Sequence, residues 1–153
     1  MVVLKTSREL KAMREAGRIS ANALKLAGEA VEPGITTWEI DEIVRKYIEG
    51  QGAVPSFLGY GGFPASACIS VNNVVIHGIP SKKCVVKKGD IVSIDIGAHL
   101  RLYGDNAWTF PAGTSARKPG PFWMPPGKAF LRESKWRRRA TASAISAARF
   151  KGM

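Results

Sequence analysis

The hydrophobic pattern of this chain changes its period once, at Gly52, and this change limits the folds that it can adopt. Before Gly52 the apolar residues recur at the spacing of one helix face, most clearly at Ile40, Ile43, Val44, Tyr47 and Ile48. Thr6 with Glu9, and Thr36 with Glu39, have the spacing of a capping box, which marks the start of a helix. We therefore predict one helix over about 7–27 and a second from residue 36 to Gly50.

After Gly52, short β-branched runs replace the helical pattern, at residues 68–71, 74–77, 85–86, 91–96 and 107–110. Two helices followed by a series of strands is the order of an α+β fold with an antiparallel sheet, and not of an alternating α/β fold. No apolar run reaches the roughly 18 residues that cross a bilayer, and the N-terminus does not resemble a secretory signal. We therefore expect a cytoplasmic protein that does not span a membrane.

The net charge of +11 is concentrated in the last part of the chain. Residues 1–113 hold 13 Lys and Arg against 11 Asp and Glu, whereas residues 114–153 hold 10 Lys and Arg against one acid, Glu133. We expect a folded domain over 1–113 and a basic, irregular tail over 114–153. A nucleic-acid or ribosome-binding module that uses this tail, through Arg137–Arg139, is an alternative that the composition leaves open.

Two carboxylates lie where a metal ion would explain them. Asp95 is inside the apolar run 91–96, where a charge is costly unless it is paired or bound to a metal. Asp105 follows after a short segment, so a turn near residue 100 would place the two directly opposite each other on one face of an antiparallel pair. Carboxylates that close repel unless one is protonated or a cation lies between them. An ordinary Gly-Asp turn at Asp105 explains the spacing equally well.

Other candidate site residues lie between Gly52 and Pro80. His77 is predicted to end an apolar strand just before a turn, where most histidines are structural. The aromatic residues of a glycine-rich loop, together with a cysteine, can line a small apolar pocket; these are Phe57, Tyr60, Phe63 and Cys68. Aromatic residues beside glycines also serve as loop anchors, and a buried cysteine usually only packs.

Five segments in one order connect these residues: 59–64 (GYGGFP), 68–72 (CISVN), 75–80 (VIHGIP), 89–97 (GDIVSIDIG) and 104–110 (GDNAWTF). Together they resemble the first half of type I methionine aminopeptidases. The resemblance implies a partial pita-bread fold, of the creatinase and aminopeptidase type, and two divalent metal ions, among which Co, Mn, Fe, Zn and Ni are not distinguished. It implies removal of the initiator methionine from nascent polypeptides by a monomeric enzyme, and it leaves association with the ribosome open.

By position, the resemblance also implies a role for each candidate residue. Asp95 and Asp105 match the first two metal-ligating aspartates of the family, and His77 matches the histidine that contacts the substrate beside the scissile peptide. In the family, the pocket for the methionine side chain is lined at positions that match Phe57, Tyr60, Phe63 and Cys68. A flexible thioether suits such a pocket.

Two features depart from the family pattern. The segment between the aspartates is one residue shorter, and a one-residue slip in a strand reverses the face that a side chain uses. The second half of the family's enzymes supplies a histidine and two glutamates as further ligands, whereas residues 114–153 contain no histidine and only Glu133. We therefore expect this chain, as it stands, to be truncated and inactive.

The codons of Phe122-Trp-Met-Pro125 suggest an origin for the tail. When they are read from the third base of the Phe codon, they encode Leu-Asp-Ala for every choice of synonymous codons, which resembles the continuation of the family. We therefore expect the residues from about 114 onward to be out of frame, through a frameshift or a sequencing error. A pita-bread peptidase that is specific for Xaa-Pro peptides remains a further alternative, which the sequence around His77 disfavours.

Overall fold

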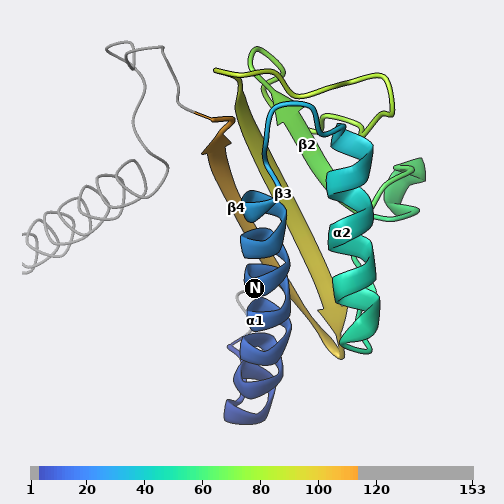
Figure 1. Cartoon of the computed structure of the whole chain (residues 1–153). Coiled ribbons are helices and arrows are strands. Elements are labelled where there is room, and N and C mark those ends of the chain that lie inside the picture. Colours follow the sequence, from blue (N-terminus) through green and yellow to red (C-terminus); the bar gives the residue numbers. More distant parts are fainter. Residues whose placement is uncertain (1–3, 114–153) are drawn as a thin grey trace, which may run out of the picture. The chain divides into compact units, whose positions relative to one another are not determined.

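The two predicted helices and the predicted antiparallel sheet are both present in the computed structural model, which describes residues 4–113 (Figure 1). The helices are α1, Ser7–Glu29, and α2, Thr37–Gly50. The strands are β1 (Val54–Pro55), β2 (Ala67–Val71), β3 (Ile91–Leu100) and β4 (Leu102–Pro111), and a short 3-10 helix, η1, covers Tyr60–Gly62. The α+β prediction is confirmed, whereas the expected tail over 114–153 lies outside the described residues.

Both helices begin at the predicted capping boxes. The hydroxyl oxygens of Thr6 and Thr36 accept hydrogen bonds from the backbone N–H groups of Glu9 and Glu39, at 3.3 and 3.2 Å. The two glutamate carboxylates accept in return from the threonine backbone N–H groups, at 2.7 and 2.8 Å. These reciprocal bonds satisfy N–H groups that a helix start leaves without a partner.

The sheet is built around β3, which pairs with every other strand. β4 runs along one edge of β3, while β1 and β2 follow one another along the other edge, and all three pairings are antiparallel. β3 and β4 form a hairpin in which Leu100 pairs with Leu102, so that the tip consists of Arg101 alone. Arg101 has a φ angle of 64°, in the left-handed region that a side chain makes unfavourable.

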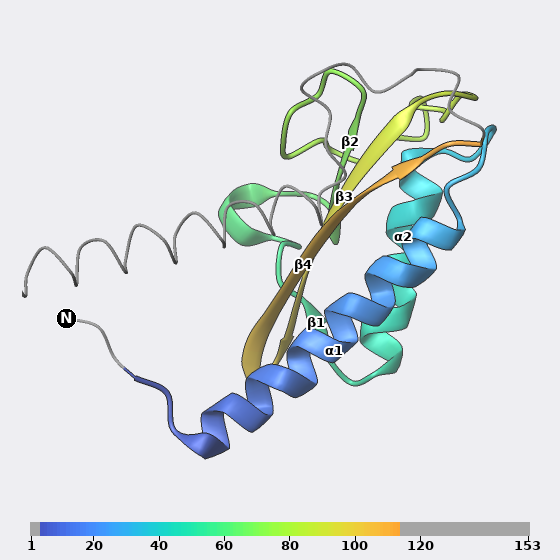
Figure 2. The same ribbon diagram turned by 90° about the vertical axis from the view of Figure 1, so that its left-hand side faces the viewer.

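Both helices cover the same face of the sheet, as Figure 2 shows. α1 packs on β3 and β4, and α2 packs on β1 and β2. A side chain at Gly104 would overlap the backbone of Ala16 and Gly17, so this glycine allows α1 to approach β4 closely. The amide nitrogen of Asn106 donates to Ser20 Oγ at 2.6 Å and to the Gly17 carbonyl at 3.1 Å, which ties the same strand to the helix.

Two predicted strands are not present. Residues 74–77 form an exposed loop, and Val85 makes only an isolated bridge with Thr36. The chain leaves the sheet at Asn72, which has a φ angle of 55° and whose side chain bonds to Asp90 and to the N–H of Ile91. Strand propensity alone predicted 74–77 wrongly, because propensity does not reveal whether a pairing edge is within reach. Within residues 4–113, neither helix is long and apolar enough to cross a membrane.

Candidate metal and substrate site

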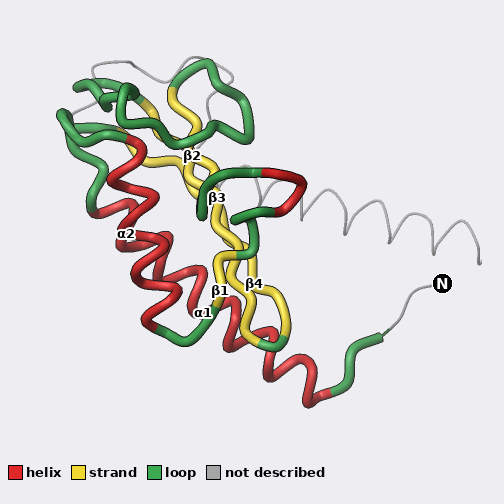
Figure 3. The backbone as a smooth tube through the Cα atoms, turned by 90° about the vertical axis from the view of Figure 1, so that its right-hand side faces the viewer, coloured by secondary structure: helices red, strands yellow, loops and turns green. Residues whose placement is uncertain are grey.

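The candidate residues gather on the face of the sheet that the helices leave open. Along β3 the buried residues Val92, Ile94, Ile96 and Ala98 alternate with Ser93, Asp95 and Gly97, since successive side chains of a strand point to opposite faces. The first set belongs to the core with the helices. The second set lies on the face approached by the segments between β1 and β3, including η1, which Figure 3 shows opposite the helices.

Asp95 and Asp105 share this face but are not directly opposite each other. Asp95 pairs with Ala107, and Asp105 pairs with Gly97, so the two carboxylates are diagonal neighbours. The prediction of direct opposition is wrong because the hairpin turns at Arg101, which lies closer to Asp105 than to Asp95. Asp105 nevertheless stays on the same face as Asp95, since its partner Gly97 is two residues from Asp95.

The Asp95 side chain is half-buried, and one of its two carboxylate oxygens lacks a partner. Its Oδ1 atom is shielded from solvent and has no hydrogen-bond partner among the described residues. Burial is the main reason that the pKa of Asp95 is raised. The charge of Asp105 and a side-chain hydrogen bond to it raise this pKa further, whereas the charge of His77 opposes the shift. Asp95 and Asp105 are therefore close enough to repel when both are ionised.

These two aspartates suit hard or borderline divalent cations, which carboxylate oxygens bind and which would relieve their repulsion. The unpartnered Oδ1 of Asp95 supplies an acceptor for such an ion. Within residues 4–113, however, His, Cys, Asp and Glu side chains do not gather in any group of three or more that could hold a metal. The described part of the chain thus fits two ligands of a metal site but not a complete site.

His77 lies in the exposed loop that follows β2, and not at the end of a strand as predicted. It has a φ angle of 56°, and its neighbour Gly78 holds the loop on β2. The Gly78 carbonyl accepts from Ile69 N at 2.8 Å, and the Gly78 N–H donates to Ser70 Oγ at 3.1 Å. A side chain at Gly78 would overlap the Ile69 carbonyl. This close attachment brings His77 near enough to influence Asp95.

The aromatic loop is tightly folded by its own backbone. Tyr60 N donates to the Phe57 carbonyl, and Phe63 N donates to the Tyr60 carbonyl, both at 3.0 Å. The Phe57 ring lies over Gly97, where a Cβ atom would be only 2.8 Å from it, so Phe57 reaches the face that carries Asp95. Phe63 is half-buried, whereas Tyr60 is 81% exposed. The structure thus brings Phe57, but not Tyr60, into the packed part of the site.

Cys68 is buried and pairs directly with Asp95 across β2 and β3. Burial raises the pKa of its thiol to about 11, and the charges of Asp95, Asp105 and Asp41 add to the effect. Such a thiol stays protonated at neutral pH and acts as a small apolar surface rather than as a nucleophile.

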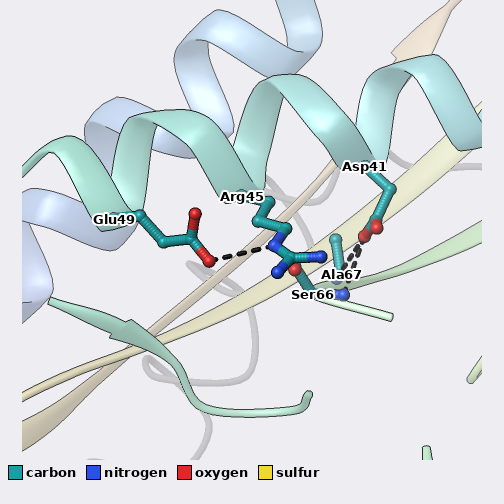
Figure 4. A network of polar contacts seen from close by, with 5 residues as sticks. All are labelled: Asp41, Arg45, Glu49, Ser66 and Ala67. Carbon is teal, nitrogen blue, oxygen red and sulfur yellow. Dashed lines mark hydrogen bonds and ion pairs between the residues drawn. The ribbon is translucent and has the colours of Figure 1, made fainter. Parts of the chain in front are cut away.

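Sequence reasoning missed Asp41, which lies in α2 and contacts the start of β2 (Figure 4). Its carboxylate accepts hydrogen bonds from the backbone N–H groups of Ser66 and Ala67. The helical spacing could have revealed it, because Asp41 falls on the same helix face as Val44 and Ile48. An acid on the apolar face of a helix is expected to be buried.

Comparison with known proteins agrees with this arrangement. Residues 11–124 match metallopeptidase family M24. Methionine aminopeptidase 1 of Bacillus subtilis is 54% identical over 114 residues, which are 74% of this chain and 46% of that protein. The fold is similar to the crystal structure of methionine aminopeptidase from Rickettsia prowazekii, with a TM-score of 0.73 and 38% identity over 76% of this chain and 47% of that one.

A proline-specific relative is less similar. The Xaa-Pro dipeptidase from Bacillus anthracis gives a TM-score of 0.63 and 25% identity, over 74% of this chain and 30% of that one. The chain spans about half the length of the methionine aminopeptidases that it matches. By sequence and by fold, this chain belongs to metallopeptidase family M24, within which it is similar to the first half of methionine aminopeptidases.

Proposed function

We propose that residues 4–113 supply the first half of the catalytic centre of an aminopeptidase that removes N-terminal methionine. The observation that carries this proposal is the buried, unpartnered Asp95 oxygen beside Asp105, on the open face of a sheet that is shared with methionine aminopeptidases. Buried polar atoms without a protein partner are rare in folded proteins, and a bound ion is one of the explanations for such an atom.

In this proposal Asp95 and Asp105 hold two divalent metal ions, which can be Co, Mn, Fe, Zn or Ni. Such ions supply a nucleophile at neutral pH and polarise a carbonyl oxygen. Because the described residues offer only two clustered ligands, the remaining ligands must come from outside residues 4–113. We therefore propose that residues 4–113 do not form an active enzyme by themselves.

The substrate-binding part of the proposal rests on the segments that approach Asp95. Phe57 and Cys68 present an apolar surface next to this carboxylate, which suits a methionine side chain, with Phe63 and Tyr60 on the same loop. His77, held beside Asp95 by Gly78, is placed to contact the substrate near the scissile peptide. The substrates that we propose are newly made polypeptides in the cytoplasm. A monomeric enzyme would bind them at the ribosome or after their release from it.

Fragment complementation tests this function. The full chain is incubated with a Met-Ala peptide and Mn²⁺ or Co²⁺, alone and together with the segment of the Bacillus subtilis relative that lies beyond the matched region. We expect no release of methionine by the chain alone and measurable release by the mixture. Asp95→Asn should abolish the release, whereas Glu32→Gln, which removes an exposed acid, should not.

Two outcomes would refute the proposed function. One is a mixture that cleaves Xaa-Pro peptides in preference to Met-Ala peptides. The other is release of methionine at the same rate with Asp95→Asn, because the metal ligands would then come entirely from the added segment.

A further inference from the structure

Asp41 joins helix α2 to the beginning of strand β2. Its Oδ1 atom accepts from Ser66 N at 2.9 Å and from Ala67 N at 2.7 Å, and the residue is only 5% exposed (Figure 4). Hydrogen bonds to an ionised acceptor are shorter and stronger than those between neutral groups. A buried acid on the apolar face of an amphipathic helix is costly, and these two bonds offset the cost.

The two N–H groups need this acceptor. Ser66 and Ala67 are both fully buried, so neither N–H group can turn to water. At this point β1 has ended and β2 is beginning along the same edge of β3. The Asp41 carboxylate therefore takes the place of a neighbouring strand for the first residues of β2.

The residues that follow directly are those of the candidate site. Ala67 pairs with Ile96, and Cys68 pairs with Asp95. If the beginning of β2 shifted along β3, Cys68 would no longer pair with Asp95. A shift of one residue would turn the thiol to the helix face. A carboxylate that fixes the beginning of β2 would therefore also fix which side chain stands opposite Asp95.

The electrostatics shows a balance between burial and hydrogen bonding. Burial is the larger effect and leaves the pKa of Asp41 raised, although the two backbone hydrogen bonds lower it. Arg45, one turn further along α2, donates from its Nε to Glu49 at 2.9 Å and acts on Asp41 through its charge only. The Asp41 charge is also one of three that raise the pKa of the Cys68 thiol.

We propose that Asp41 is a positioning residue for the candidate site: by binding the N–H groups of Ser66 and Ala67, its carboxylate holds Cys68 in register opposite Asp95. This proposal rests on the proposed function for its catalytic meaning. The contact itself depends only on the fold.

The test uses the full chain with Cys84→Ser, so that Cys68 is the only thiol. Amide hydrogen exchange is measured at Ser66 and Ala67, and the rate of Cys68 alkylation by iodoacetamide is measured against pH. Asp41→Ala removes both acceptors, so we expect exchange at these two amides to rise at least about tenfold while α1 is unchanged. Asp41→Asn keeps an acceptor oxygen but loses the charge. We therefore expect near-native exchange and an alkylation profile displaced to lower pH.

Glu42→Ala is the matched control, since it removes a neighbouring acid that binds neither amide. It should leave exchange at Ser66 and Ala67 unchanged. Equal exchange in Asp41→Ala and Glu42→Ala would overturn the proposal. If Asp41→Ala does not fold, Asp41→Ser decides, because its shorter side chain cannot bind both amides as the aspartate does. Exchange at Ser66 and Ala67 equal to that of the parent would then overturn the proposal. Neither readout needs metal or peptide cleavage, so failure of the aminopeptidase assay would be recognised separately.

Discussion

Asp95 is held in the folded state at a cost in stability. Because its pKa is raised, its ionised form is less favourable in the folded chain than in the unfolded chain. The cost is absent below the ordinary carboxyl pKa, where both states are protonated. It grows as pH rises from the ordinary pKa to the raised one and is constant above that, where both states are ionised. Asp95→Asn should therefore increase the stability at pH 7, by less than about 1 kcal/mol because solvent screens a half-buried carboxylate, and raise Tm slightly. Thermal melts between pH 3 and pH 7 check this.

The difference in stability between Asp95→Asn and the parent chain should depend on pH. The gain of Asp95→Asn should vanish at pH 3, because the parent carboxyl is then neutral as well. Glu32→Gln, at an exposed position, should change Tm little at either pH. A variant that is less stable than the parent at pH 7 would show that the Asp95 carboxylate serves the fold rather than a ligand.

Single residues differ in how far the sequence predicts them. Asp95 and Asp105 were predicted on one face from strand alternation, and they do share it. Asp41 and Asn106 were not predicted to be important, because their partners are 25 and 86 residues away in sequence. Periodicity shows that a polar residue falls on a buried face, but only the tertiary structure shows which group satisfies it.

At the scale of elements, the capping box of α2 is expected to contribute measurably to stability. Thr36→Ala removes the acceptor for Glu39 N and the donor for the Glu39 carboxylate. The loss should be about 1 kcal/mol, as for other N-cap residues. Thr36→Ser retains both interactions and should restore most of it. Urea unfolding of the two variants measures the difference, and equal midpoints for them would contradict the role of the cap.

The hairpin between β3 and β4 turns on Arg101 in a left-handed conformation. A side chain there costs about 1–2 kcal/mol, and glycine removes this cost. Arg101→Gly should therefore stabilise the chain by up to about 1 kcal/mol, once the greater freedom of glycine in the unfolded state is subtracted. Arg101→Lys keeps the side chain and should have no effect. A stability of Arg101→Gly at or below that of Arg101→Lys would show that the tip is not strained.

Elements were predicted well where two signals agreed. Both helices combined a capping box with a regular apolar face, and the structure confirms them. The run 74–77 had only β-branched residues in its favour, and Val75 is 85% exposed in a loop. The hairpin was predicted near residue 100, but its register depends on the tip, which strand alternation does not define.

At the scale of the whole molecule, the described fold has one covered face and one open face. The helices cover one face of the sheet, whereas the other carries the candidate site and a loop with exposed apolar residues, including Val75, Ile76 and Ile79. Matched relatives are about twice as long. An open face that combines the two candidate ligands with apolar surface agrees with the proposal that this chain supplies one half of a site.

The step in composition at residue 114 leads to a prediction about the coding DNA. If the basic residues after Gly113 are out of frame, a shift by one base should open a frame that encodes Leu-Asp-Ala across the codons of Phe122–Pro125. That frame should go on to encode a histidine and two glutamates that complete the metal site. If the frame changes, we expect the change near residue 114 and before the codon of Phe122. Resequencing the genomic DNA and translating all three frames tests this.

The absence of a family-like continuation in both shifted frames would reject the frameshift. The segment 114–153, with its 10 basic residues and one acid, would then be a genuine part of the protein. In that case its charge predicts binding to RNA with a steep dependence on salt, because each phosphate contact releases counterions. Deleting residues 114–153 should abolish that dependence, while the fold of residues 4–113, whose core is made by α1, α2 and the sheet, should persist.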